Sequence, residues 1–198
     1  GDFSANGSQG LITFSFGGGS NYASLATGSV NFDQTVEVTF DALPGSSVFA
    51  GGILGRFTGT SDTYMAQARV STTGALSLRL TKFVGGVETT LGDYTLNDLL
   101  MAARSTVSIR FAAYGAFLKT KLWKGADEPS MWGIEVTDTS HTTAGTVGLF
   151  ATNGTGAAGP VIRFDNYTVG PAQPWFGYYE LQRMDTVTTN WQTIMKAT

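Results

Sequence analysis

Asp138, Ser140 and His141 have the residue types of a hydrolase triad, but they lie within four positions of one another. A triad needs groups that converge from different elements, and the strained Gly-x-Ser-x-Gly turn of many hydrolases does not occur in the chain. Asp and Ser side chains commonly bond to nearby backbone groups. We therefore interpret this stretch as a polar turn rather than a nucleophilic site.

Three carboxylates, Asp33, Glu37 and Asp41, recur at every fourth position. Glycoside hydrolysis needs two carboxyl groups about 5 to 10 Å apart, and this spacing on one strand would supply them. Val36 and Val38 alternate with the carboxylate positions, which places the carboxylates on the face opposite the apolar residues. We expect a solvated charged face here rather than a catalytic pair.

The stretch Gly154-Thr155-Gly156-Ala157-Ala158-Gly159 formally matches the GxGxxG pattern of dinucleotide sites. Such a site needs a helix directly after the glycines, so that the helix N-terminus meets the pyrophosphate. Pro160 and a strand-like segment follow instead. We expect a loop between strands.

Two further groups of residues point to binding. Asp165 lies in a late strand-like segment, where a carboxylate can hold Ca²⁺ together with backbone carbonyls or form ordinary hydrogen bonds at a sheet edge. Aromatic rings provide platforms for sugars, although most rings in a sandwich fill its core. The candidate rings are Tyr64, Tyr94, Tyr114, Trp123, Trp132, Trp175, Tyr178, Tyr179 and Trp191.

The elements that would position these residues are β-strands. Only 14% of the 198 residues are charged, and 26 residues are glycine, a composition typical of strands and tight turns. The net charge of −3 and the absence of a basic stripe argue against nucleic-acid binding. The chain has no cysteine and one histidine, and it lacks an apolar run long enough to cross a bilayer, so we expect no membrane insertion.

Alternating segments separated by turn residues recur along the chain, which predicts an all-β sandwich. Gly85 and Gly86 predict a two-residue hairpin turn. Residues 97–103 could form two helical turns that begin at an Asn97 cap. We expect residues 1–170 to form the sandwich, residues 171–177 a linker, and residues 178–198 a hairpin extension or the start of a further module of a longer chain.

Several motifs resemble, in order, the second half of concanavalin A-like lectin/glucanase (LamG-like) domains. They are Leu122-Trp123 with the turn up to Trp132, then Thr137-Asp138-Thr139-Ser140, Gly145-Thr146-Val147-Gly148-Leu149 and Phe164-Asp165-Asn166. The resemblance implies a jelly-roll sandwich of two antiparallel sheets, and it implies Asp165 as a calcium ligand. Members bind glycans, cleave them or act as spacers. The Glu-x-Asp-x-x-Glu string of the hydrolytic members does not occur in this chain.

Residues 178–196 resemble the opening strands of a fibronectin-like module of actinobacterial phage tail proteins. The resemblances together imply a virion or extracellular location and a non-catalytic module that binds a surface glycan. We expect loop-borne Tyr64, Tyr114 and Asn153 to contact the glycan. The alternatives are a structural module, in which Trp175, Tyr178 and Trp191 contact neighbouring assembly subunits, and a glycan hydrolase.

Overall fold

The computed structural model describes residues 2–5, 9–13, 19–153, 161–173, 181–184 and 191–195. All regular elements in these ranges are strands, and every pairing between them is antiparallel. No helix long and apolar enough to cross a membrane occurs within these ranges. The predicted all-β fold is confirmed.

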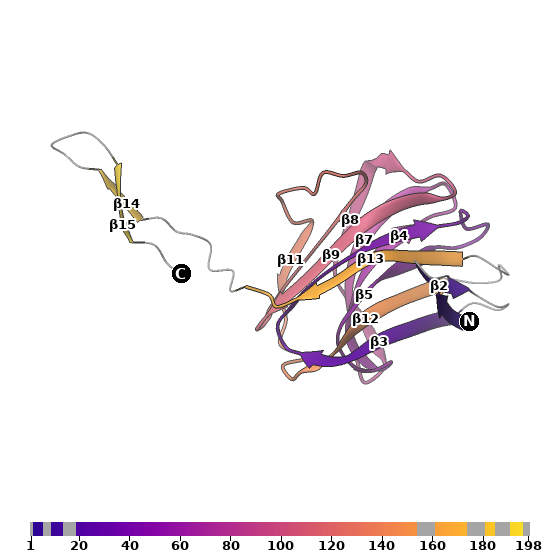
Figure 1. Ribbon diagram of the computed structural model, residues 1–198, viewed down its shortest axis with the longest axis horizontal. Coiled ribbons are helices and arrows are strands. Elements are labelled where there is room, and N and C mark those ends of the chain that lie inside the picture. Colours follow the sequence, from indigo (N-terminus) through magenta and orange to yellow (C-terminus); the bar gives the residue numbers. More distant parts are fainter. Residues whose placement is uncertain are drawn as a thin grey trace.

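Two sheets stack as the layers of a sandwich, with β4, β9 and β13 in one layer and β5, β7 and β12 in the other (Figure 1). The seven-stranded sheet has the order β1 (Asp2–Ala5), β2 (Gly10–Thr13), β13 (Val161–Gly170), β4 (Phe32–Phe40), β9 (Ser105–Tyr114), β10 (Phe117–Trp123) and β11 (Ile134–Thr137). The six-stranded sheet has the order β3 (Gly19–Ser29), β12 (Gly145–Asn153), β5 (Phe49–Gly59), β6 (Asp62–Val70), β7 (Ala75–Val84) and β8 (Val87–Leu100). Two further strands, β14 (Leu181–Met184) and β15 (Trp191–Met195), pair with each other.

The core lies between the two sheets and follows directly from period-two alternation. Every second residue of β4 is buried, and Val36 and Val38 are fully buried. Leu76, Leu78 and Leu80 of β7 are likewise fully buried. Burial of each such side chain stabilises the fold by about 1.5–3 kcal/mol. The residues between them, such as Arg79, must therefore face outward.

Close approach of the two sheets depends on a glycine in β5. Phe32 and Phe111 of the seven-stranded sheet pack edge to face, with ring centroids 5.1 Å apart. A Cβ on Gly55 would lie 2.3 Å from the Phe32 ring and 2.8 Å from the Phe111 ring. These two rings can occupy the core only because residue 55 has no side chain.

The predicted helix over residues 97–103 is wrong. Residues 97–100 continue β8, where Leu100 pairs with Ala75, and the Met101 amide donates to the Gly74 carbonyl at 2.8 Å. Pairing along β7 provides hydrogen bonds and buries Met101, whereas an isolated two-turn helix is only marginally stable. The hairpin turn at Gly85 and Gly86 is confirmed, since both residues have positive φ (57° and 82°).

Candidate functional site

The outer face of the six-stranded sheet carries two rows of residues, each with one residue from every strand of the sheet. Because Leu76 and Leu78 face the core, Ser77 and Arg79 face outward, and the strand register extends these positions across the sheet. One outward row consists of Ser20, Thr152, Ala50, Arg69, Ser77 and Thr95. The next row consists of Tyr22, Phe150, Gly52, Gln67, Arg79 and Asp93.

This face is hollowed into two adjoining depressions, which together we call the sheet groove. The first depression, of about 220 Å³, is lined by Ser20, Tyr22, Val48, Ala50, Met65, Gln67, Arg69, Phe83, Glu88 and Thr152. The second, of about 310 Å³, is lined by Val48, Arg69, Ser71, Ala75, Leu76, Ser77, Arg79, Asp93 and Thr95. Val48 and Arg69 line both depressions, and the lining residues come from all six strands, so the groove runs across the strands rather than along them.

The first depression has an apolar part, to which Met65, Phe83 and Tyr22 contribute, even though it faces away from the core. Leu54, Met65 and Phe150 form a second buried cluster on this side of the sheet, with Phe83 and Tyr22 partly buried against it. Such a recessed apolar part with partly exposed rings offers surfaces for the C–H faces of a ligand.

Polar groups surround that apolar part. The Gln67 amide, which is 4% exposed, donates to the Thr81 hydroxyl at 2.9 Å, and Arg79 Nε donates to Asp93 Oδ2 at 2.6 Å. Burial lowers the pKa of Arg69, and the nearby Arg79 lowers it further, while Asp93 and Glu88 oppose the shift. Donors and acceptors with nearly balanced charge suit a ligand rich in hydroxyl groups.

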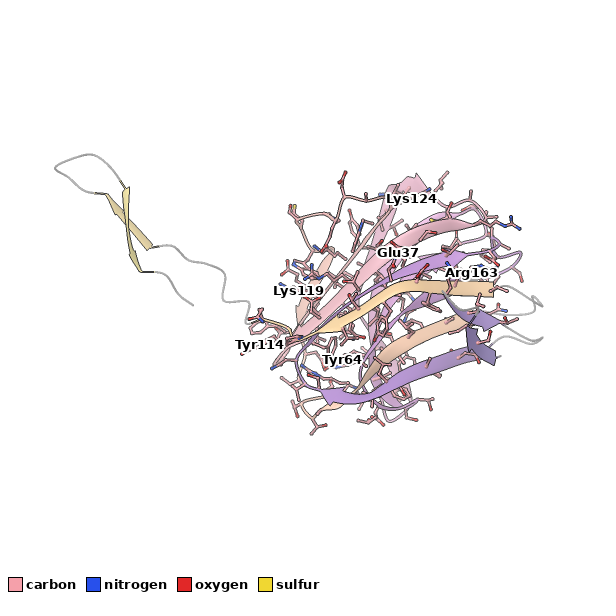
Figure 2. The ribbon with its side chains drawn as sticks, viewed as in Figure 1. Glu37, Tyr64, Tyr114, Lys119, Lys124 and Arg163 are labelled. Carbon is pink, nitrogen blue, oxygen red and sulfur yellow. The ribbon has the colours of Figure 1, made fainter. Side chains whose placement is uncertain are left out.

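The three residues predicted to contact a glycan do not lie in loops and do not line the groove. Tyr64 belongs to β6 and is fully buried, with its hydroxyl donating to Asp138 Oδ1 at 2.7 Å. Burial raises the pKa of Tyr64 to about 12. Asn153 is the last residue of β12 and is 2% exposed. Tyr114 ends β9 and lies at one end of the sandwich (Figure 2).

The Asp138, Ser140 and His141 segment belongs to a structural cluster. His141 Nε2 bonds to the Phe83 carbonyl at 2.7 Å, and the Ser140 hydroxyl accepts from Lys82 Nζ at 2.7 Å, so serine and histidine do not pair with each other. Burial raises the pKa of Asp138, but hydrogen bonds from Lys82, Tyr64 and the Ser140 amide outweigh it and hold this pKa well below its usual range. The turn therefore has its predicted local bonding.

Buried Arg56 connects the same cluster to three loops. It has a positive φ of 50°, is 1% exposed, and its guanidinium lies 5.7 Å from the centroid of the Tyr64 ring. The guanidinium donates to the Val30 carbonyl at 2.9 Å, to the His141 carbonyl at 2.6 Å and to the Gly115 carbonyl. All three acceptors are backbone carbonyls, so Arg56 has a structural role.

Asp33 and Glu37 of β4, and Asp41 directly after it, lie on the outer side of the seven-stranded sheet, as predicted. Arg110 donates to both oxygens of Asp33 at 2.8 and 2.6 Å, and Arg163 donates to both oxygens of Asp41 at 2.7 and 2.6 Å. Figure 2 shows Glu37 on β4 and Arg163 on the neighbouring β13. Two of the three carboxylates are therefore occupied by ion pairs.

The carboxylate of Asp165 receives amide donors. Gln9 Nε2 donates to Oδ2 at 3.1 Å, and the Asn166 amide donates to Oδ1 at 2.8 Å. Glu37 lies opposite Asp165 in the register and accepts from Asn166 Nδ2 at 3.0 Å. Calcium needs six to eight oxygen ligands, and within the described ranges no group of three or more acidic, His or Cys side chains is placed to hold a metal. Calcium binding at Asp165 together with backbone carbonyls stays a prediction.

Other predicted features lie beyond what the structure describes. The GxGxxG stretch at 154–159, Trp175 and Tyr178 fall outside the described residues. Trp191 is the first residue of β15. The assembly role predicted for these three aromatic residues stays a prediction.

Sequence reasoning missed the residues of the sheet groove. The available signal was Met65 and Phe83, apolar residues at positions that strand alternation assigns to the outer face. An apolar residue there indicates that the outer face itself is partly buried. That signal could identify the outer face of the six-stranded sheet, but it could not predict the sheet groove.

The fold is similar to those of several solved proteins. The carbohydrate-binding module CBM66 from Bacillus subtilis has a TM-score of 0.64 and 15% identity, with 85% of this chain and 91% of that chain covered. A legume lectin-like domain from Entamoeba histolytica has a TM-score of 0.61 and 13% identity, with 87% and 88% covered. The CBM2 module of the evolved Dit of Lactobacillus casei BL23 phage J-1 has a TM-score of 0.50 and 13% identity, with 88% and 82% covered.

No protein-family model matches the chain, and no curated protein matches its sequence. At these identities the structural similarity establishes the fold. The chain forms a concanavalin A-like sandwich of two antiparallel sheets, as its motifs predicted.

Proposed function

We propose that this protein is a non-catalytic carbohydrate-binding module and that its glycan lies in the sheet groove. The observation that carries the proposal is the recessed outer face of the six-stranded sheet, where Tyr22 and Phe83 stand beside Gln67, Arg69 and Glu88. Rings match the C–H faces of pyranoses, and planar polar side chains match their hydroxyls. The groove crosses several strands, which suits a linear polysaccharide. The fold shared with a carbohydrate-binding module and a lectin-like domain supports the same proposal.

A glycan array with Tyr22→Ala tests this function. Wild-type protein is expected to bind one or more polysaccharides, and the variant to bind them about tenfold more weakly because a ring platform is lost. Tyr114→Ala is the matched control, since Tyr114 does not line the groove. A blank array for wild-type protein, or equal losses in the two variants, contradicts the proposal.

The absence of catalysis is part of the proposal. Asp33 and Asp41 are held in ion pairs with Arg110 and Arg163, and in the groove Asp93 is bonded to Arg79. These contacts support binding rather than hydrolysis, because a catalytic carboxylate must exchange protons or attack. New reducing ends in a mixture of the protein with bound polysaccharide would contradict it.

The biological setting is proposed on the resemblance of the sequence. The module belongs to a phage tail or a secreted surface assembly, where it displays the groove to cell-surface glycans, and residues 178–198 open a fibronectin-like module. Running the array with and without Ca²⁺ tests the calcium ligand proposed at Asp165. Binding that is the same in both conditions removes calcium from the mechanism.

A structural module is the second candidate, and the β14–β15 pair favours it. Two strands alone are marginally stable and readily pair with other chains. In that case Trp191→Ala should weaken assembly with neighbouring subunits and leave glycan binding unchanged. Unaltered assembly, measured by size-exclusion chromatography of the mixed subunits, contradicts this candidate.

A further inference from the structure

A second cavity, which we call the edge pocket, lies on the core side of the six-stranded sheet at its β8 edge, where it is lined by Leu78, Tyr94 and Leu96. Its volume is about 480 Å³, within the range of small-ligand sites. Strand β11 pairs only with Phe117–Thr120 of β10, so the residues 121–123 of β10 have no neighbour from β11. The pocket opens at this gap, between β8, the end of β10 and the connecting segment 124–133.

The interior of the pocket is apolar. Leu78 is fully buried, Leu122 is 6% exposed and Trp123 is 9% exposed, and all three line the cavity. Leu96 and Leu99, partly buried against the core, line it as well. A hydroxyl placed against these side chains would lose its hydrogen bonds with water and find no replacement, which is unfavourable.

The mouth of the pocket is amphipathic. Tyr94 is 51% exposed and Met131 is 80% exposed, both unusual for large side chains of this type. Lys124 and Asp127 also line the cavity and are exposed. A ligand here can stack on a ring while it meets one cationic donor and one anionic acceptor.

The wall formed by segment 124–133 is fixed to the sheet. Glu128 accepts from Arg110 and from Lys121 at 2.6 Å each, and Lys121 Nζ donates to the Pro129 carbonyl at 2.7 Å. Trp132, which lines the cavity, lies under cations, with Lys121 Nζ 4.6 Å from its ring centroid. A preformed wall lowers the ordering cost of binding.

We propose that the edge pocket binds an acetamido-sugar residue. The methyl of the N-acetyl group enters the leucine-lined interior, the pyranose ring stacks on Tyr94, and the amide bonds to Asp127 and Lys124 at the mouth. An unsubstituted sugar would present a hydroxyl to the leucines and is rejected. This inference rests on the proposed glycan-binding function and adds a second site with its own specificity.

The test compares N-acetylglucosamine with glucose, which lacks only the acetamido group. The probes are the indole N–H resonances of the four tryptophans in the ¹⁵N-labelled full chain. N-acetylglucosamine is expected to shift indole signals of Trp123 and Trp132, assigned by Trp→Phe substitution, while glucose leaves them unchanged. Equal shifts with both sugars, or none with either, overturn the proposal.

Two variants separate this site from the groove. Tyr94→Ala should weaken N-acetylglucosamine binding about tenfold, because the platform is lost, and leave array binding of the groove polysaccharide intact. Tyr22→Ala should do the reverse. Tyr94 is exposed, so its truncation preserves the fold, which an unchanged thermal transition verifies. Loss of N-acetylglucosamine binding in Tyr22→Ala but not in Tyr94→Ala overturns the edge-pocket site alone and leaves the groove proposal standing.

Discussion

The outer faces of the two sheets are built from the same strand alternation and have opposite character. On the seven-stranded sheet, Arg110 and Arg163 bind Asp33 and Asp41 in two-point ion pairs. On the six-stranded sheet, outward positions carry Leu54, Met65 and Phe150, all of them buried. On the seven-stranded sheet these charged side chains pair with one another. On the six-stranded sheet, apolar side chains are buried next to polar ones.

The difference shows that side chains pointing away from the core can have different roles in the two sheets. Charges that are paired on an open face are well solvated, and such pairs contribute little to stability. Side chains in a hollow are partly desolvated before a ligand arrives, as the lowered pKa of Arg69 indicates. This difference supports the six-stranded sheet as the proposed recognition face.

The largest expected effect is a difference in the free energy of unfolding between substitutions on the two outer faces. Phe150→Ala removes a fully buried outward ring and should lower the free energy of unfolding by about 3–5 kcal/mol. Thr39→Ala, at an outward position of the seven-stranded sheet where Thr39 and Thr106 share one hydrogen bond, should cost about 0.5 kcal/mol or less. Urea unfolding measures both, and similar losses would remove the contrast between the faces.

A second effect contrasts Asp138, a partly buried carboxylate with several hydrogen-bond donors, with a more exposed ion pair. Asp138→Asn should cost about 1.5–3 kcal/mol at neutral pH because it weakens charged hydrogen bonds from Lys82 and Tyr64. Asp41→Asn, in a partly exposed pair with Arg163, should cost about 1 kcal/mol or less. Urea unfolding at neutral pH compares the two.

The acid dependence of the same variant follows from the depressed pKa of Asp138. A carboxylate with a lowered folded-state pKa stabilises the fold fully above the unfolded pKa of about 4. That contribution is lost as the pH falls from there toward the lower folded-state pKa. The free energy of unfolding of the wild type should therefore fall more steeply with decreasing pH than that of Asp138→Asn. Parallel curves of unfolding free energy against pH would contradict the assignment of this acid sensitivity to Asp138.

The smallest effect concerns binding. Arg79 lines the groove and Arg163 does not, although each is held by one aspartate. Arg79→Ala should weaken glycan binding about threefold to tenfold, and Arg163→Ala should leave it unchanged. Titration calorimetry with the array-selected glycan measures both. If Arg163→Ala alone weakened binding, the recognition face would be the seven-stranded sheet.

Strands and core were predictable because alternation is local. The pattern around Val36 and Val38 already assigns one buried face and one wet face. The helix predicted at Asn97 failed because a local cap signal competes with pairing along β7, a contact that the chain makes only once folded.

The proposed binding surfaces were less predictable, because they depend on contacts between distant parts of the chain. The groove depends on how the register brings Tyr22 of β3 and Phe83 of β7 to one face, four strands apart in the sheet order. The edge pocket depends on Glu128 reaching back to Arg110, which no spacing rule specifies. Tyr64 shows the converse error, a tyrosine predicted at the surface that the core encloses.

The guanidinium of Arg56 has a consequence for the folding kinetics. Its three carbonyl acceptors lie 26, 59 and 85 residues away along the chain, so they converge only when both sheets are assembled. Contacts that form after the rate-limiting step slow unfolding and leave the folding rate nearly unchanged. We expect Arg56→Lys to unfold faster than wild type in stopped-flow experiments while it refolds at a similar rate. Arg56 would then stabilise the assembled sandwich kinetically, by slowing its unfolding.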